Sequence, residues 1–471
     1  MEKIRRLQGM EDLAGPAWRA LREVQQGLGS LFARYGYVPL DTPLLEDADL
    51  FLRKVGGELA VRMYTFADPG GNRVVLRPEF TASVVRRYLE VEGSQPLPWR
   101  VQYCGPVFRY ESDTDRRQFT QAGVEIIGTD SAQADAEVLD LAFASLNALG
   151  VTGHVLTVGD AGIYHSLVEQ LGLSERARRF LLGSLALLAE GEAGLAKVEE
   201  EAQRLHLILT ETGDETPSGL ATSFDEEASR ALLRHLLVDA PELLGQRTPQ
   251  EVEERLLSRL RGDRPKQVRK ALEVAFRLAS IRGEPSKALG SARVLTREYK
   301  LSAEPLDRLA NLLELASQQE MPKGSLALDL GLVRGVAYYT GFVFDVTHPS
   351  APLVLGGGGR YDTLVRELGH TRDVPALGFA LTLENVAGLV GVPAPTQAEQ
   401  VKVLAVPENK AAYNAALRVA QALRGEGKVV EMELVERSTD ERMAYARARG
   451  IQQVVVVDAK GRTVKRSVEE E

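Results

Sequence analysis

The sequence predicts an α+β fold, in which an antiparallel β-sheet with flanking helices is combined with a helical insertion and a small C-terminal α/β domain. Three observations predict it. Strand-like pieces with helices between them fill the first 150 residues and return after residue 324, the segment 173–318 is helical in nearly every window, and strands alternate with helices after residue 400. A chain of 471 residues exceeds what one hydrophobic core usually serves, so two or three units are expected.

The N-terminal region contains the clearest local signals. Residues 17–35 repeat apolar groups at helical spacing and end at Gly36. The turn sequence PGGN at 69–72 predicts a β-hairpin, and Ser131 is the expected N-cap of the next amphipathic helix. Consecutive hairpins with helices between them favour a mainly antiparallel sheet with helices packed on it.

The limits of the domains follow from these changes of pattern. A core domain is expected at 1–172 and 319–391, interrupted by the helical insertion at 173–318, and an α/β domain at 399–471. Glu/Arg pairs at three- and four-residue spacing within the insertion are most simply explained as solvated helix faces.

Composition excludes several classes of protein. The chain has 57 Lys and Arg against 66 Asp and Glu, a formal charge of −9, which argues against a dedicated basic nucleic-acid binder. The start of the chain has no apolar signal-peptide core, and no run reaches the roughly 18–20 apolar residues of a membrane span, so a cytoplasmic protein is expected. The single cysteine, Cys104, excludes an intramolecular disulfide, and its apolar neighbours predict a buried core thiol.

Four stretches place charged residues inside strand-like sequence, where an unpaired charge is expensive. They are 76–81 (LRPEFT), 108–125 (FRYE through RQFTQAGVE), 332–341 (LVRGVAYYTG) and 356–384 (GGGGRYD through GFALTLE). Gln121 and Glu125 are four apart, so both face one side of a regular strand, where carboxylates and an amide could hold an ammonium and an imidazole. Each motif alone is equally compatible with a structural ion pair, and Gly356–Gly359 alone with a flexible turn.

Together and in this order, the motifs resemble those of the class II histidyl-tRNA synthetases over most of the chain. The sequence GMED at 9–12 looks like the N-terminal signature of that family, and Pro43 lies where its motif 1 places a dimer-interface proline. The stretch 108–125 looks like motif 2, 332–341 like the histidine-specific motif, and 356–384 like its companion and motif 3. The last 70 residues resemble the anticodon-binding domain, in a truncated form.

The resemblance implies a site. The residues that it assigns to histidine binding are Glu79, Thr81, Gln121, Glu125, Arg334, Tyr338, Tyr339 and Tyr361. In a working ligase, Arg109 and Arg334 would be catalytic, and Arg109, Glu111 and Arg117 would bind ATP. No metal site is implied, and no cofactor is expected beyond the Mg and ATP of that ligase alternative.

The chain departs from the family pattern mainly where ATP and tRNA are handled. Asn385 stands where motif 3 normally has its arginine, Ala337 replaces an aspartate, and Phe80 replaces a glycine. The motif 2 loop, 112–116, is short and lacks the Arg-Pro-Gln that helps engage the acceptor end. From residue 401 onward, 13 Lys and Arg against 11 Asp and Glu leave a charge of only +2, little for an anticodon stem.

Two hypotheses follow. The pattern matches the synthetase-like regulatory subunit of ATP phosphoribosyltransferase, which would dimerise near Pro43, assemble with the catalytic subunit and respond to histidine as effector, without catalysis of its own. Neither tRNA nor a membrane is favoured as a partner.

The alternative is an active histidine–tRNA ligase or amino-acid-activating paralogue that forms histidyl-adenylate. The retained C-terminal domain favours this alternative, and Arg360 is the only nearby candidate in sequence for the missing positive charge.

Overall fold

The computed structural model describes residues 4–52, 61–110, 116–205, 207–208, 265–318, 321–332, 338–390 and 401–468. The chain forms two compact units, Met1–Gly391 and Val392–Glu471. Most of the helices expected at 173–318 fall in the described part of the first unit, and the limits 172/173 and 318/319 stay predictions.

The first unit is built on a nine-stranded sheet. Its strands, in spatial order, are β1 (Val38–Pro39), β5 (Trp99–Phe108), β6 (Gln118–Ile127), β12 (Ala376–Thr382), β11 (Gly356–Arg360), β10 (Phe342–Thr347), β7 (Val155–Asp160), β9 (Leu326–Asp329) and β8 (Arg282–Gly283). Only the β1–β5 and β7–β9 pairs are parallel, so the predicted mainly antiparallel sheet is confirmed.

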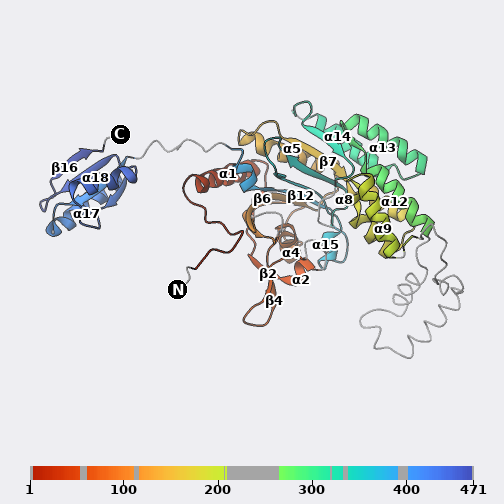
Figure 1. The fold of residues 1–471 in the computed structure, drawn as a ribbon, viewed down its shortest axis with the longest axis horizontal. Coiled ribbons are helices and arrows are strands. Elements are labelled where there is room, and N and C mark those ends of the chain that lie inside the picture. Colours follow the sequence, from red (N-terminus) through yellow and green to blue (C-terminus); the bar gives the residue numbers. More distant parts are fainter. Residues whose placement is uncertain are drawn as a thin grey trace. The chain divides into compact units, whose positions relative to one another are not determined.

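Helices cover the two faces of this sheet (Figure 1). α1 (Gly15–Arg34) and α5 (Ala132–Ala148) lie on one face, where Val124 and Ile126 of β6 join their core. α4 (Thr81–Val91) and α15 (Leu364–Glu367) lie on the other, where Phe119 and Ile127 pack. Because side chains alternate along a strand, β6 presents its odd-numbered residues, including Gln121 and Glu125, to the α4 face.

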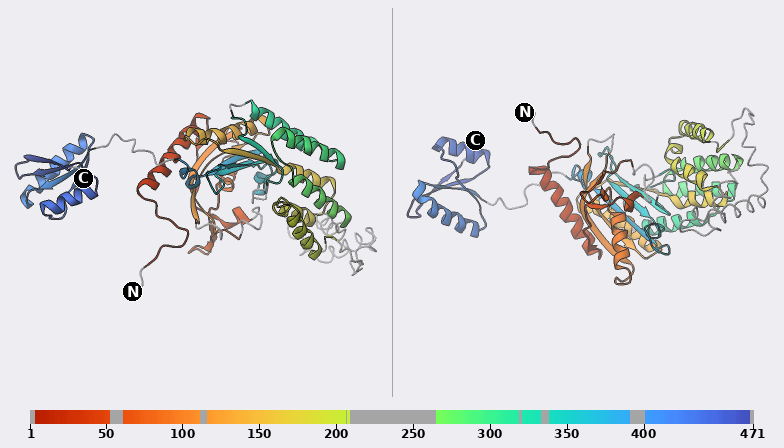
Figure 2. Two further views of the ribbon diagram at one scale, coloured as in Figure 1. Left: turned by 45° about the horizontal axis from the view of Figure 1, so that its top comes forward. Right: turned by 90° about the horizontal axis from the view of Figure 1, so that it is seen from below.

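A further group of described helices gathers at one end of the sheet (Figure 2). They are α6 (Ala161–Gln170), α7 (Glu175–Gly183), α8 (Leu185–Leu188), α9 (Glu192–Arg204), α12 (Pro265–Ala279), α13 (Pro285–Tyr299) and α14 (Glu304–Ser317). Their buried faces belong to the same hydrophobic core as α1 and α5, and α14 packs directly on α5.

Two local predictions are confirmed. The PGGN turn joins β3 (Thr65–Ala67) to β4 (Arg73–Leu76), which also pairs with β2 (Leu45–Asp47), beside the short helix α2 (Ala48–Leu52). The Ser131 side chain accepts a hydrogen bond from the Ala134 N–H at 3.2 Å and so caps α5.

The structure also decides two points that concern single segments. The glycine run forms a buried strand, β11, in keeping with the strand-like stretch 356–384, and not the flexible turn that the run alone would allow, because its neighbours leave no room for side chains. A Cβ atom at Gly358 would lie 1.9 Å from the Gly378 carbonyl oxygen, and one at Gly356 would lie 2.3 Å from the Ala380 carbonyl oxygen. The prediction of a buried thiol was wrong: Cys104 is exposed, on the face of β5 opposite to Tyr103 and Val107.

The second unit has the strand–helix alternation that the sequence predicts. Its four-stranded sheet has the order β14 (Val429–Met432), β13 (Lys402–Pro407), β15 (Gln453–Val457), β16 (Thr463–Ser467), with the short helix η2 (Lys410–Ala412), α17 (Tyr413–Gly425) and α18 (Thr439–Ala448). In neither unit does a described helix have the length and apolar character needed to span a membrane.

Candidate functional site

Two carboxylates, Glu79 and Glu125, are buried on the α4 face of the large sheet. Their exposed fractions are 6% and 1%. Glu125 lies on β6, and Glu79 lies in the segment between β4 and α4. A buried carboxylate is costly unless polar groups surround it, so its partners indicate what the site is built for.

Glu125 is held by three neutral hydroxyl groups. Thr81 Oγ1 donates to it at 2.8 Å, Tyr103 Oη at 3.1 Å, and Tyr361 Oη donates to its second oxygen. Burial raises the pKa of Glu125 to about 8, against the lowering effect of these donors. Among the described residues no lysine or arginine hydrogen-bonds Glu125, so its negative charge lacks a directly bonded cation there.

Glu79 is held by the backbone at the start of α4. Its carboxylate accepts hydrogen bonds from the N–H groups of Thr81 and, at 3.0 Å, of Ala82. The helix N-terminus stabilises this negative charge, while burial raises the pKa of Glu79 above its ordinary value. The side chains of Glu79 and Glu125 are thus linked through Thr81, which contacts both.

Aromatic rings close the same region. The rings of Tyr338 and Tyr361 meet edge to face at 5.6 Å, and Tyr339 lies against Tyr338 at 5.1 Å. The pKa values of Tyr338 and Tyr361 are raised well above the ordinary value by burial and then by the carboxylates, so both phenols stay protonated and can donate. Gln121 Oε1 is buried without a hydrogen-bond partner among the described residues.

Most of the residues predicted for histidine binding are therefore brought together. Hydrogen bonds join Glu79, Thr81 and Glu125, and Tyr361 donates to Glu125. The ring of Tyr338 contacts the rings of Tyr361 and Tyr339. Gln121 lies on the same face of β6 as Glu125. Arg334 lies outside the described residues, as does Ala337.

Tyr103 is a member of the site that sequence reasoning missed. It lies on β5 directly opposite Gly123, and a Cβ at Gly123 would be 2.6 Å from the Tyr103 hydroxyl oxygen. The signal available in the sequence was a tyrosine on one strand of the hairpin paired with a glycine on the other, which leaves room for the ring. The ring of Phe80 stacks on that of Tyr103, with 4.3 Å between the ring centres, and the Arg77 guanidinium lies 3.8 Å from the centre of the Phe80 ring. Phe80 therefore supports a tyrosine that donates a hydrogen bond to Glu125.

The loop end of the β5–β6 hairpin is basic. Arg109 Nε donates to the Pro78 carbonyl at 2.8 Å, next to Glu79, and the Arg109 guanidinium lies 5.3 Å from the ring centre of Phe119. Arg117 lies over the ring of Tyr110 at 4.1 Å. Glu111, predicted to bind ATP with them, lies outside the described residues.

The start of α16 (Leu383–Ala387) meets the same end of β6. The Glu384 carboxylate accepts the Thr120 N–H at 2.8 and 2.9 Å. Asn385 Nδ2 donates to the Val354 carbonyl at 2.9 Å, and its Oδ1 accepts a hydrogen bond from Arg116 Nη1 at 3.2 Å.

Arg360 does not take the place of the missing arginine. It is 5% exposed and its guanidinium bonds Asp135, Asp362 (3.0 Å) and the Thr129 carbonyl (3.0 Å). This arrangement is a buried structural ion pair, and Asp135 keeps a pKa raised by burial to about 6.

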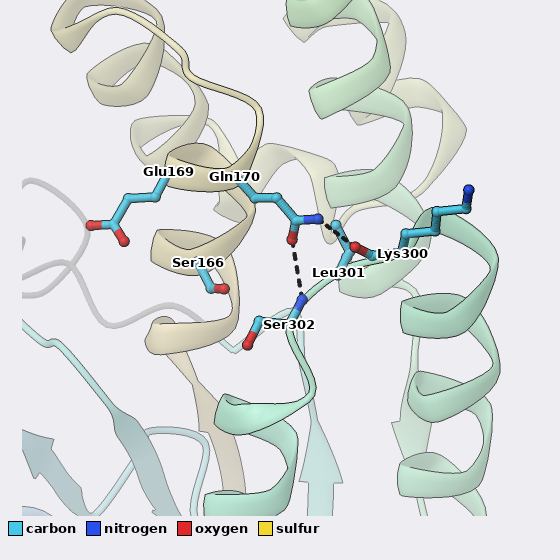
Figure 3. A pocket seen from close by; sticks show the side chains of 6 residues that line it. All are labelled: Ser166, Glu169, Gln170, Lys300, Leu301 and Ser302. Atoms are coloured by element: carbon cyan, nitrogen blue, oxygen red, sulfur yellow. Dashed lines mark hydrogen bonds between the residues drawn. The ribbon is translucent and has the colours of Figure 1, made fainter.

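A surface pocket of about 510 Å³ lies elsewhere in the unit, between α6 and the turn that joins α13 to α14 (Figure 3). Its central amide is already used: Gln170 donates to the Lys300 carbonyl and accepts from the Ser302 N–H at 3.1 Å. The amide ties the turn to α6, and the pocket lacks the buried titratable groups of the α4 face.

The arrangement on the α4 face combines groups that suit a small cation. Two buried carboxylates and the Gln121 amide oxygen, which has no described partner, are acceptors of the kind that hold an ammonium group or a nitrogen heterocycle, and arginines lie at the loop end of the β5–β6 hairpin. Within the described residues, negative and positive groups thus occupy separate ends of one site.

Comparisons with known proteins identify the family of the chain. The sequence profile named Histidyl-tRNA synthetase matches residues 9–237 and 250–386. The histidine–tRNA ligase of Sulfolobus acidocaldarius is 27% identical over 464 residues, 98% of this chain and 92% of the relative. That of Metallosphaera sedula is 30% identical over 427 residues, 89% and 83%.

Solved structures share the fold. An ATP phosphoribosyltransferase regulatory subunit/histidyl-tRNA synthetase from Bacillus halodurans superposes with a TM-score of 0.67 at 20% identity, covering 97% of this chain and 99% of that one. The apo histidyl-tRNA synthetase of S. aureus gives 0.61 at 23% identity, covering 99% and 98%. From the matched profile, together with these likenesses, the chain belongs to the histidyl-tRNA synthetase family.

Proposed function

We propose that this chain is a regulatory subunit of ATP phosphoribosyltransferase that binds histidine and does not aminoacylate tRNA. The observation that carries the proposal is the contrast within the site. The buried carboxylates Glu79 and Glu125 keep hydrogen-bond donors around them, whereas Asn385 stands where the resemblance places the motif 3 arginine and Arg360 is committed to Asp135 and Asp362.

The proposed ligand fits the pocket by charge. A histidine ammonium beside Glu125 and Glu79 would supply the cation that the described partners of Glu125 lack, and the Tyr338 phenol can donate to an imidazole nitrogen. Feedback control requires only that histidine bind two assembly states with different affinity.

The proposal includes a cytoplasmic homodimer within a larger complex. Edge strand β1 and the neighbouring small sheet carry exposed apolar side chains, including Val38 (62%), Leu45 (48%) and Phe66 (46%). Exposed apolar groups clustered along short edge strands are typical of surfaces that another chain covers. The catalytic subunit of ATP phosphoribosyltransferase is the proposed partner beyond this dimer.

The test is reconstitution. The full chain is mixed with a short-form catalytic subunit, and phosphoribosyl transfer is measured with and without histidine, together with the mass of the complex. Activation, histidine inhibition and loss of that inhibition in Glu125→Gln are expected. A chain that neither assembles with the catalytic subunit nor changes its activity would rule the proposal out.

A working ligase is the second candidate, and one observation favours it. The C-terminal unit is retained, and the alignment with the Sulfolobus ligase runs through it. Histidine-dependent exchange between ATP and pyrophosphate on the purified chain separates the two. Robust exchange would establish adenylation, whereas a folded protein without exchange would support the regulatory role.

A further inference from the structure

Helix α6 contacts the chain before and within the stretch 332–341, which supplies the tyrosines of the pocket. Tyr164 and His165 are consecutive residues in the middle of this helix. Tyr164 Oη donates to the Leu330 carbonyl oxygen at 2.7 Å, and His165 Nε2 lies 3.2 Å from the Tyr339 carbonyl oxygen. Leu330 precedes the stretch and Tyr339 lies near its end, so two neighbouring side chains hold the backbone at both points.

The contact of His165 with Tyr339 fixes the form of the imidazole ring. A carbonyl oxygen can only accept a hydrogen bond, so Nε2 carries the hydrogen and donates it. Burial lowers the pKa of His165 below its ordinary value, against the raising effect of the Tyr339 carbonyl. The charges of Arg178 and Glu169 act on this pKa in opposite directions. The ring is therefore neutral near neutral pH and serves as an uncharged donor.

The start of α6 lies against the same part of the chain. The Ala161 N–H donates to the Gly341 carbonyl oxygen at 2.8 Å. A Cβ atom at Gly162 would lie 3.0 Å from the Thr340 carbonyl oxygen, so the two backbones approach closely there. The first five residues of α6 thus meet residues 339–341 one after another.

Tyr339 connects these contacts to the pocket. Its ring centre lies 5.1 Å from that of Tyr338, and the Tyr338 ring meets that of Tyr361 edge to face at 5.6 Å. Tyr361 in turn donates a hydrogen bond to Glu125. Because packed aromatic rings favour particular mutual orientations, a displaced Tyr339 backbone would disturb the rings beside Glu125.

We infer that Tyr164 and His165 are positioning residues of the proposed histidine site, which act from outside the pocket on the backbone that carries Tyr338 and Tyr339. The inference rests on the proposed binding of histidine. In the part of the chain that the structure describes, neither side chain bonds a carboxylate of the pocket, since both donate to carbonyl oxygens. The larger effect belongs to His165, because its bond reaches a pocket tyrosine directly.

Two substitutions of His165 separate hydrogen bonding from packing. In His165→Gln the amide nitrogen stands about where Nε2 stands in histidine, so a neutral donor to Tyr339 is kept. His165→Leu fills a similar volume without a donor. Both residues favour helices, so α6 itself is not weakened. A packing role predicts that leucine is tolerated as well as glutamine, whereas a positioning role predicts that only glutamine is.

The experiment uses the full chain alone, without a catalytic subunit. Histidine binding is measured by titration calorimetry. The ligand-free chain is also labelled with fluorotyrosine, and fluorine NMR follows the signals of Tyr338 and Tyr339, assigned by substitution with phenylalanine. His165→Leu should weaken histidine binding roughly 5- to 30-fold and shift both signals, and His165→Gln should restore both properties.

Two further variants complete the series. Tyr164→Phe removes the bond to Leu330 and should weaken histidine binding by less, roughly 2- to 10-fold. Ser166→Ala is the matched control on the same helix, because Ser166 lines the surface pocket of Figure 3, and it should change neither the affinity nor the signals.

Three results would overturn the inference. One is equal histidine affinity in the wild type and His165→Leu. Another is a folded His165→Gln that binds histidine as weakly as His165→Leu. The third is a ligand-free His165→Leu in which the signals of Tyr338 and Tyr339 do not move. The NMR signals need no ligand, so they test the positioning even if the wild type binds no histidine, a result that would count against the proposed function.

Discussion

The two ends of the site are built in different ways. At the carboxylate end, Glu125 lies in the middle of β6, flanked by β5 and β12, and its partners come from β5, the start of α4 and the residue after β11. The guanidinium end lies where β5 and β6 leave the sheet, and its arginines rest on carbonyl oxygens and ring faces. Substitution of a buried carboxylate also requires substitution of its hydrogen-bond partners. An arginine at a strand end can be substituted with less effect on its neighbours.

The largest effect should come from filling the space next to Glu125. Gly378 lies opposite it on β12, and a Cβ there would be 1.8 Å from Glu125 Oε2 and 2.3 Å from the Val124 carbonyl oxygen. Gly378→Ala should lower the free energy of unfolding by about 3 kcal/mol or more and abolish histidine binding. Urea denaturation and calorimetry measure both.

Gly290→Ala is the control, because nothing lies within 4 Å of its Cβ position in α13. It should stabilise the protein by about 0.5–1 kcal/mol. Equal stability of the two alanine variants would show that the tight approach of β12 to Glu125 is not real.

The next effect tests the charge at the carboxylate end. Glu125→Gln keeps the shape and removes the negative charge, so histidine affinity should fall by about 2–4 kcal/mol, as for a buried charge that loses its partner. Glu46→Gln is the matched control, a buried carboxylate on β2 that bonds Arg86 at 2.9 Å. Titration calorimetry with histidine should separate the two variants, and comparable losses would show that the pocket lies elsewhere.

The pH dependence of stability tests the burial of the carboxylate end. The pKa of Glu125 is about 8 when folded, above that of the unfolded chain, so the folded state binds more protons between about pH 4.5 and 8. Its contribution to stability is therefore full below that window and is lost as pH rises through it. Glu79 and Asp160 act in the same direction.

The free energy of unfolding of the ligand-free protein should thus decrease from pH 5 to pH 8, as urea denaturation at several pH values can measure. Glu125→Gln should flatten this decrease without removing it. A slope unaffected by the substitution would mean that Glu125 titrates normally.

The smallest effect concerns the phenol donors. Tyr103→Phe and Tyr361→Phe each remove one hydrogen bond to Glu125 and should each weaken histidine binding by about 1–2 kcal/mol. Tyr299→Phe, which removes a hydroxyl bonded to Glu273 at 2.6 Å on the helical side, should leave histidine binding unchanged. Unchanged affinity in both pocket variants would place the ligand away from Glu125.

The fold and the carboxylate end were largely predictable from the sequence. The PGGN hairpin and the Ser131 cap follow from local chemistry, and the four-residue spacing of Gln121 and Glu125 fixes their shared face. The family resemblance supplied the order of the motifs, and the matched profile confirms it.

Features that depend on distant neighbours were not predictable. The glycine run looked like a turn because the lack of space at Gly358 is set by Phe379 and Gly378 on another strand. Arg360 looked available as a free cation because Asp135, its main partner, is 225 residues away. Arg116 was overlooked because its contact with Asn385 spans 269 residues.

The pairing of Tyr361 with Glu125 spans 236 residues of chain. During synthesis at about 5–20 residues per second, the strand carrying Glu125 leaves the ribosome roughly 10–50 s before the strands that shield it. While these 236 residues are made, β6 has β5 on one side and an unpaired edge on the other, so early pairing with another strand-bearing segment would protect it. The contact between Tyr361 and Glu125 is thereby a late event in synthesis.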